Sequence, residues 1–182
     1  MKFKRIFIIL IALVVAYFSV MFIMKEYIFP YKYSEYIDRF SEEYDVDPLF
    51  VLSIIKAESN FNENAVSIRG AKGLMQIMDE TGAWAAEEIG MNYFLPSMLF
   101  DSEINIEMGV WYLAELEKEF NDLDLVIAAY NGGSGNVTKW LKDEAYSKDG
   151  ENLYYIPFPE TKKYVDKVKI NYSIYKYLYR RD

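Results

Sequence analysis

An uncharged apolar run near the start of the chain divides it into two parts of different character. Residues 6–24 read IFIILIALVVAYFSVMFIM and contain no charged side chain. About 20 apolar residues are enough for a helix to cross the hydrocarbon core of a bilayer. The run is longer than the ~7–15 residues of a usual signal-peptide core, and no polar face interrupts it as in a soluble core helix. We therefore predict a cytoplasmic flank and transmembrane anchor over residues 1–25, a linker over 26–34 and one folded domain over 35–182.

The flanks of this run differ in charge. Three basic residues precede it, and one base and one acid follow it: Lys2, Lys4 and Arg5, then Lys25 and Glu26. Positive flanks tend to stay in the cytoplasm. The expected location is the cytoplasmic membrane, crossed once, with the domain on the extracytoplasmic side. The alternative is a cleaved signal peptide, which is less favoured because no convincing small-residue cleavage site precedes Tyr27.

Two missing residue types limit the chemistry of the domain, since the chain has no cysteine and no histidine. The first absence excludes disulfides, thiolate nucleophiles, thiolate metal ligands and a lipid-modified N-terminal cysteine. The second excludes a Ser-His-Asp triad and an imidazole zinc site. Acid–base chemistry must then come from carboxylates, tyrosine, lysine or water.

The charge balance argues against nucleic acid as a partner. The chain has 20 basic and 28 acidic residues. Four of the bases lie within the first 25 residues, which leaves 16 bases against 28 acids and a net charge of −12 in the remainder. Nucleic-acid binding needs basic surface that neutralises phosphates, so we expect no nucleic-acid partner.

Helix signals recur along the domain and predict an all-α fold. Asp47 can cap free backbone N–H groups, and Pro48 suits a first helical turn. Asp101 gives a similar start to a long helix, and the GGSG sequence at 132–135 breaks another. The expected helices cover residues 33–44, 48–59, 81–89, a stretch from Asp101 to Phe120, 125–131, 134–141 and 159–179. The candidate strand is residues 153–158.

Glu58 lies at the C-terminal end of a largely apolar helix, with Val51, Ile54 and Ile55 on the adjacent stripe. Burial raises the pKa of a carboxyl group, as a general acid requires if it is to keep its proton near neutral pH. On this local pattern alone, an exposed glutamate at a helix end is the favoured interpretation.

Four blocks, in order, resemble the lytic transglycosylase family that includes the soluble bacterial enzymes, whose catalytic domain is similar to goose-type lysozyme. The blocks are Glu58-Ser59, the S-x-x-G-A-x-G-L-M-Q sequence from Ser67 to Gln76, the AYNGG sequence from Ala129, and E-T-x-x-Y-V from Glu160. The resemblance spans about residues 35–180 and implies a lysozyme-like helical domain with a sugar-binding cleft. Two positions depart from the family pattern. Asp79 stands where the family often has proline, and Gly132 where it often has alanine. We expect Asp79 to cap the next helix through its side chain.

The same resemblance implies a reaction on the glycan strands of peptidoglycan. Glu58 would protonate the oxygen between N-acetylmuramic acid and N-acetylglucosamine, then accept the proton of the muramic acid C6 hydroxyl as that oxygen closes a 1,6-anhydro ring. No cofactor and no metal is implied. Two alternatives stay open: a lysozyme-type hydrolase, and a non-catalytic glycan-binding or scaffold module.

Further substrate-binding roles come from the resemblance alone, and they fall to Ser67, Met75, Gln76, Tyr130, Asn131 and Glu160. Structural alternatives exist for several of them. Ser67 could serve only as a turn residue, and Met75 and Tyr130 could simply pack in the core. Glu160 follows Pro159 and could act only on the helix dipole. The tyrosines of the last helix, Tyr164 included, are expected to pack on the domain.

Overall fold

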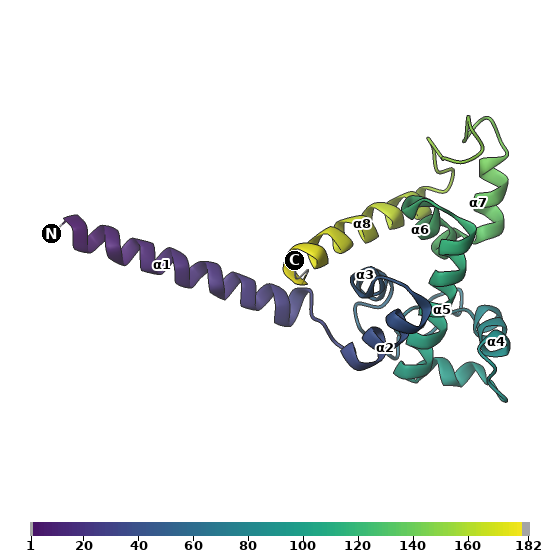
Figure 1. Ribbon diagram of the computed structural model, residues 1–182, viewed down its shortest axis with the longest axis horizontal. Coiled ribbons are helices and arrows are strands. Elements are labelled where there is room, and N and C mark those ends of the chain that lie inside the picture. The colour runs from purple at the N-terminus through teal and green to yellow at the C-terminus, as the bar shows by residue number, and fades with distance from the viewer. Residues whose placement is uncertain (1, 180–182) are drawn as a thin grey trace.

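The computed structural model describes residues 2–179, so residue 1 of the predicted anchor and residues 180–182 of the predicted domain lie outside it. A long helix projects from a helical domain (Figure 1). The elements are α1 (Lys2–Ile23), a π-helix η1 (Met24–Ile28), α2 (Ser34–Tyr44), α3 (Pro48–Glu58), α4 (Asp79–Glu88), a 3-10 helix η2 (Pro96–Phe100), α5 (Ser102–Glu119), α6 (Leu123–Gly132), α7 (Ser134–Leu141) and α8 (Pro159–Tyr179). Over these residues there are isolated β-bridges but no strand, and the all-α prediction is confirmed.

The predicted helix boundaries at Asp47, Asp101 and the glycine break are confirmed. The Asp47 carboxylate accepts from the backbone N–H of Leu49 at 2.8 Å. The Asp101 carboxylate accepts from the next two free N–H groups of α5, at 3.0 and 3.1 Å. Gly133 has φ +87° between α6 and α7, a conformation that favours glycine. These local signals fix where α3, α5 and α6 begin or end.

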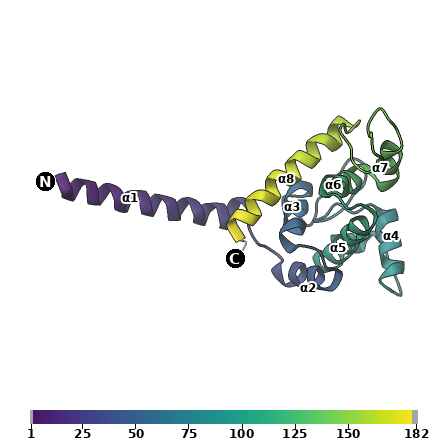
Figure 2. The ribbon, with the colours of Figure 1, turned by 45° about the horizontal axis from the view of Figure 1, so that its top comes forward.

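Helix α3 lies at the centre of the domain. It packs against α2 and α8. Helix α5 packs on α2, and helix α6 packs on α8 (Figures 1 and 2). Five of its apolar side chains are at most 1% exposed: Phe50, Val51, Leu52, Ile54 and Ile55. A helix that is apolar on nearly every side belongs inside a core. Its last residue is Glu58, so the core holds the end of the helix that carries the candidate acid.

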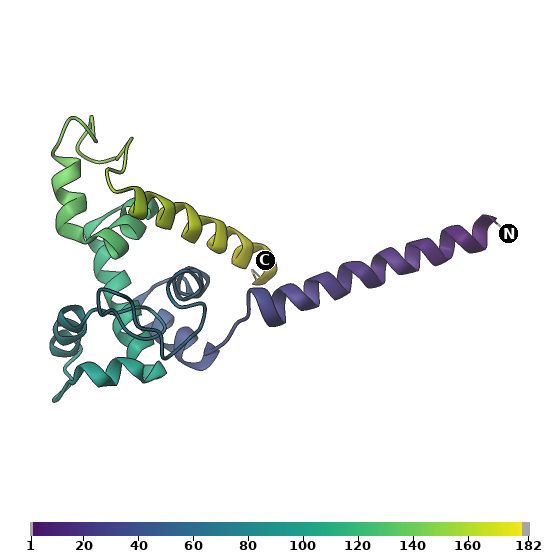
Figure 3. The same cartoon turned by 180° about the vertical axis from the view of Figure 1, so that it is seen from behind.

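Helix α1 extends away from the domain (Figure 3). Its apolar side chains are exposed. By length and composition, the segment Phe3–Ile28 is a candidate membrane span. The predicted linker, residues 26–34, is packed rather than extended. Phe29 and Pro30 are buried, and Phe29 makes an edge contact with the ring of Tyr175 of α8.

Two local predictions are wrong. Residues 153–158 form a loop instead of a strand. Tyr154 folds this loop back on the preceding turn, because its backbone N–H donates to Tyr146 O at 3.1 Å and its hydroxyl to Glu144 O at 3.0 Å. Asp79 does not cap α4 with its side chain. Met78 is at the cap position, and the Asp79 carboxylate pairs with Lys72 instead.

Candidate active site

The Glu58 carboxyl group is placed where water hardly reaches it. It ends the buried helix α3 and is only partly exposed, toward a cleft. Burial raises its pKa from 4.5 to about 7, although a hydrogen bond from Tyr164 and the charge of Lys167 both act to lower it. Loss of hydration penalises the charged form more than these two contacts compensate. Glu58 therefore keeps its proton to a higher pH than an exposed glutamate does.

Helix α8 supplies the groups that hold this carboxyl in place. The Tyr164 hydroxyl donates to Glu58 Oε1 at 2.6 Å. Lys167, one turn further along α8, donates from Nζ to the backbone carbonyl of Ala57 at 2.6 Å. Tyr164 itself is 8% exposed, so the expected packing role holds, and the contact with Glu58 adds to it. The sequence indicates no contact for Lys167.

A cleft of about 710 Å³ opens in front of Glu58. Its walls come from the end of α3, the loop between α3 and α4, the middle of α5, the end of α6 and the start of α8. Six of the seven predicted site residues line it: Glu58, Ser67, Gln76, Tyr130, Asn131 and Glu160. The fold thus brings together, around one carboxyl group, residues that lie up to about a hundred positions apart in the sequence.

The loop between α3 and α4 is fastened to α5 by a buried amide. Asn105 is fully buried. Its Nδ2 donates to Leu99 O at 2.8 Å and to Lys72 O at 3.0 Å, and its Oδ1 accepts from Met75 N at 2.7 Å. Gly73 makes this close approach possible, because a Cβ there would lie 2.2 Å from Leu99 O. The glycine and the amide together fix the wall of the cleft that carries Ser67 and Gln76.

Met75 is the predicted site residue that does not line the cleft. Its side chain is fully buried and packs on α5, where a Cβ at Gly109 would lie 2.3 Å from Met75 Sδ. Its backbone carbonyl accepts the Tyr130 hydroxyl at 2.8 Å. Met75 therefore holds Tyr130 through its backbone, and its side chain packs in the core.

Gln76 and Ser67 shape the loop with the same side chains that face the cleft. Gln76 has φ +51°, and its Nε2 donates to Gly73 O at 2.9 Å and Ala65 O at 3.1 Å. This leaves the side-chain oxygen of Gln76 as an acceptor for a ligand. The Ser67 Oγ accepts from Ala71 N at 3.0 Å, so Ser67 closes a turn in addition to lining the cleft.

The far wall joins α6 to α5 and α8. The Tyr130 ring lies 5.5 Å from that of Tyr112, centre to centre, and burial together with nearby Glu58 raises its pKa. Asn131 accepts from the Thr161 hydroxyl at 2.9 Å, so its side chain braces α8 in addition to lining the cleft. Tyr112 was not among the predicted site residues.

Glu160 and Arg69 meet at the mouth of the cleft, on opposite walls. Their charged groups lie 3.5 Å apart, and both side chains are more than three-quarters exposed. An ion pair so open to water contributes little stability. Among the described residues that line the cleft, Glu58 and Glu160 are the carboxylates, and only Glu58 is sheltered from water.

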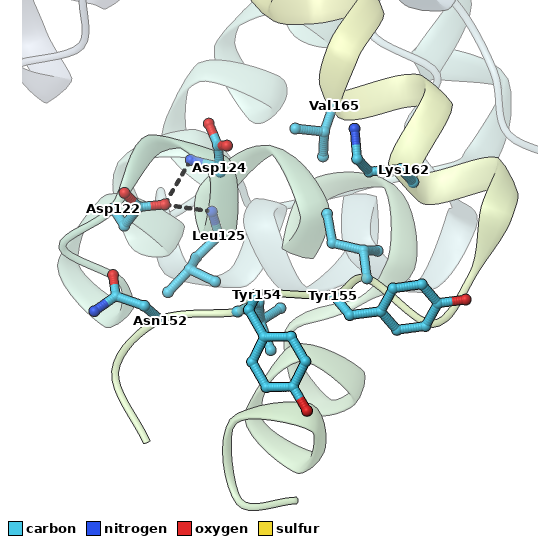
Figure 4. Close-up of a pocket in the computed structure, with 10 residues that line it drawn as sticks. Asp122, Asp124, Leu125, Asn152, Tyr154, Tyr155, Lys162 and Val165 are labelled. Carbon is cyan, nitrogen blue, oxygen red and sulfur yellow. Dashed lines mark hydrogen bonds between the residues drawn. The ribbon is translucent and has the colours of Figure 1, made fainter. Parts of the chain in front are cut away.

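A second cavity, of about 270 Å³, lies between the start of α6, the loop before α8, and α8 (Figure 4). Its carboxylates already have partners. Asp122 accepts from Asp124 N and Leu125 N to cap α6, and Asp124 binds Lys169 at 2.7 Å. Lys162 pairs with Asp166. The groups in this cavity hold the fold together, and the cleft at Glu58 is the better candidate for catalysis.

Comparison with known families agrees with this geometry. The model of the Transglycosylase SLT domain family matches residues 35–153. The chain belongs to this family. The match begins one residue after the start of α2 and covers Glu58, the loop carrying Ser67 and Gln76, and the Tyr130 block. It stops before α8.

Relatives and solved structures extend the match. The chain is 34% identical to the soluble lytic murein transglycosylase of Escherichia coli K12 over 152 residues, which is 82% of this chain and 24% of that protein. It is 39% identical to membrane-bound lytic murein transglycosylase C of Edwardsiella ictaluri over 119 residues, 60% of this chain and 33% of that protein. The complex of the 70 kDa soluble lytic transglycosylase with bulgecin A aligns with a TM-score of 0.73 at 30% identity, covering 82% of this chain and 25% of that one. An inactive glutamate-to-glutamine mutant of lytic transglycosylase Slt from Pseudomonas aeruginosa aligns with a TM-score of 0.72, at 30% identity and over 82% and 24% of the two chains.

These alignments confirm the lysozyme-like SLT fold that the motifs predicted. The chain spans about a quarter of the length of the soluble relatives it matches. What it shares with them is the domain that contains the cleft.

Proposed function

We propose that this chain is a peptidoglycan lytic transglycosylase. It would cleave the β-1,4 bond between N-acetylmuramic acid and N-acetylglucosamine and leave 1,6-anhydromuramic acid ends. The observation that carries the proposal is Glu58, a carboxyl group with a pKa of about 7 inside a cleft of sugar-binding size. A pure binding module has no need for an acid whose pKa is raised by burial.

The first step uses the protonated form of Glu58. Tyr164 donates to Oε1, so the proton of the neutral carboxyl sits on Oε2 and is available to the glycosidic oxygen. Its transfer lets the bond from that oxygen to muramic acid C1 break with both electrons leaving on the oxygen. Glu58 is then a carboxylate, and the Tyr164 hydroxyl and Lys167 charge stabilise it at the moment when it forms.

The second step uses the same carboxylate as a base. It accepts the proton of the muramic acid C6 hydroxyl while that oxygen bonds to C1, which closes the anhydro ring and restores neutral Glu58. No water enters the balance. Most glycosidases need two carboxylates, whereas here the substrate supplies the nucleophile. The exposed, Arg69-paired state of Glu160 is consistent with one acid serving twice.

The remaining cleft residues are proposed to position the sugar. Ser67, Gln76 and Tyr130 offer hydrogen-bonding groups around Glu58. Asn131 would act on the substrate only in part, because its side-chain oxygen is already engaged by Thr161. Glu160, at the mouth, would contact parts of the strand further from the reacting bond.

The proposed location follows from α1 and from the substrate. We propose that α1 crosses the cytoplasmic membrane once and that the domain lies outside, where peptidoglycan is. Lys2, Lys4 and Arg5 would remain on the cytoplasmic side. The exposed apolar surface of α1 supports a lipid environment for this helix.

Mass spectrometry of the fragments released from purified peptidoglycan by the full chain in detergent tests the activity. We expect products one water lighter than hydrolytic fragments, without a reducing muramic acid end. The Glu58→Gln variant should bind glycan but release almost nothing, because an amide can neither donate this proton nor accept one. Glu42→Gln, the same change on the exposed face of α2, is the matched control and should retain activity.

Products with a reducing end would replace the proposal with lysozyme-type hydrolysis. Binding without release by the unmodified chain would replace it with a glycan-binding module. Substantial activity in Glu58→Gln would remove Glu58 from the mechanism.

A further inference from the structure

The C-terminal end of α8 is fastened to the segment that follows α1. The Tyr179 hydroxyl lies 2.7 Å from the backbone oxygen of Phe29 and 3.0 Å from that of Lys25. The Tyr175 hydroxyl donates to Pro30 O at 3.2 Å, and Lys25 Nζ lies 5.1 Å above the Tyr179 ring. All three ribbon views place the end of α8 beside the end of α1 (Figures 1, 2 and 3). The anchor and the domain therefore meet through a packed joint.

The same two helices enclose an apolar groove of about 470 Å³. We call it the α1–α8 groove; α1 and the first residue of η1 contribute Tyr17, Val20, Met21 and Met24 to it, and α8 contributes Ser173, Ile174, Tyr177 and Leu178. Tyr17 of α1 and Tyr177 of α8 both line this groove. Contact between α8 and α1 thus reaches back to Tyr17, which lies well inside the uncharged run 6–24.

This register brings α8 to the level of the lipid. If residues 6–24 span the bilayer, the last turns of α8 lie at the depth of residues 17–24, which is the outer part of the hydrocarbon. Exposed apolar side chains continue the groove along α8, since Ile170 is 61% and Tyr177 71% exposed. Ile170, Ile174 and Tyr177 follow one another at helical spacing on one face.

The charge of this end of α8 is opposite to that of the rest of the domain. Residues 167–181 contain five bases and no acid: Lys167, Lys169, Lys176, Arg180 and Arg181, the last two beyond the described residues. Lys167 and Lys169 are bound to Ala57 O and Asp124 of the domain, so the positive charge available to a membrane comes from Lys176 and the residues after α8. The part of the chain after residue 25 carries 28 acids against 16 bases. Bases and tyrosines are the residues that gather where a protein meets a membrane surface.

We propose that the C-terminal half of α8 is a second membrane contact, in which lipid acyl chains fill the α1–α8 groove and anionic headgroups attract the basic C-terminal end of the chain. The proposal rests on the proposed anchor and goes beyond it, because it adds α8 to the surface that contacts the membrane. With α8 seated on the same membrane, the domain and its cleft keep one orientation above the lipid.

Site-specific fluorescence in the full chain tests this contact. The chain has no cysteine, so single cysteines can carry an environment-sensitive dye in vesicles of phosphatidylcholine and phosphatidylglycerol. Ser173→Cys places the dye at the groove on α8. Ser19→Cys places it at the same level of α1 on a different face, and Ser97→Cys places it on η2, which packs on α4 and α5, away from α1. All three serines are exposed, so labelling should leave the fold intact.

We expect lipids with a shallow nitroxide quencher to dim the Ser173 dye about as strongly as the Ser19 dye, and several-fold more than the Ser97 dye. Quenching at Ser19 without quenching at Ser173 would overturn the second contact and leave the anchor standing. A Ser173 dye that is shielded from water but not quenched by lipid would mean that a protein surface covers the groove, which also overturns the proposal. Absence of quenching at Ser19 would overturn the anchor itself, and with it this inference.

Discussion

Replacing Glu58 by glutamine should stabilise the fold, and more so at higher pH. The folded-state pKa of Glu58 is raised from 4.5 to about 7. Below pH 4.5 the carboxyl is neutral in both the folded and the unfolded chain, so it has no effect on stability. Between pH 4.5 and about 7, Glu58 loses its proton in the unfolded chain but still holds it in the folded chain, so the free energy of unfolding falls as the pH rises. Above pH 7 the folded chain carries the full cost of a poorly hydrated carboxylate.

The size of the effect follows from the pKa. A rise of the Glu58 pKa from 4.5 to about 7 lowers the free energy of unfolding by about 2–3 kcal/mol, after a discount for the partial exposure of this carboxyl group to the cleft. Glutamine keeps the shape, still accepts from Tyr164 and never ionises. We expect Glu58→Gln to exceed the unmodified chain by about 1 kcal/mol or less at pH 5 and by about 2–3 kcal/mol at pH 8, or roughly 4–10 °C in Tm for a domain of this size.

Urea unfolding of both proteins at several pH values, followed by circular dichroism, measures this difference. The exposed Glu42→Gln serves as the control for the exchange of glutamate by glutamine outside the cleft. A difference for Glu58→Gln that does not grow with pH, or that shrinks toward pH 8, would refute the argument that burial holds the proton on Glu58.

Other substitutions test the neighbours of Glu58 and the loop that lines its cleft. Tyr164→Phe removes a hydrogen bond that lowers the Glu58 pKa, so the alkaline limb of kcat/KM should move to higher pH, and an unmoved limb would contradict the role of this contact. Gly73→Ala should destabilise by about 2 kcal/mol or more, since φ is +76° and a Cβ would lie 2.2 Å from backbone oxygen. Gly135→Ala, with nothing near its Cβ, should be neutral or stabilising by up to about 1 kcal/mol. Equal effects of Gly73→Ala and Gly135→Ala on the free energy of unfolding in urea would refute the packing argument. Asn105→Asp removes two donors to buried carbonyls, so it should cost about 3 kcal/mol or more, and a loss below about 1 kcal/mol would contradict the fastening role.

The features that could be predicted from the sequence are those determined by a few adjacent residues. Asp47 with Pro48, Asp101 and the glycine pair before Ser134 each satisfy or interrupt backbone hydrogen bonds within one turn, so their pattern alone determines a boundary. The same is true of the apolar run of α1. The family motifs predicted which blocks gather at the cleft, because each block carries several residue types at fixed spacing.

The features that the sequence did not predict depend on contacts between distant segments. Tyr164 meets Glu58 across 106 positions, and Lys167 meets Ala57 across 110. Tyr164 belongs to the E-T-x-x-Y-V block, but nothing local indicates the partner of either residue, since tyrosine and lysine both occur at ordinary helical positions of α8. Asp79 was expected at a cap, but Lys72, brought near by the β-bridged loop, offers its carboxylate a charged partner. Met75 turns into the core because Gly109 leaves space for it.

Helix α8 touches the proposed catalytic acid near one end and the proposed anchor at the other, so it sets the distance between the two. Tyr164 and Tyr179 are fifteen residues apart on one helix, which is roughly 22 Å along its axis. An enzyme held in this way would act at a fixed distance from the membrane. It would cut strands in the layer of wall next to the membrane, and strands that lie further out would be spared by distance alone.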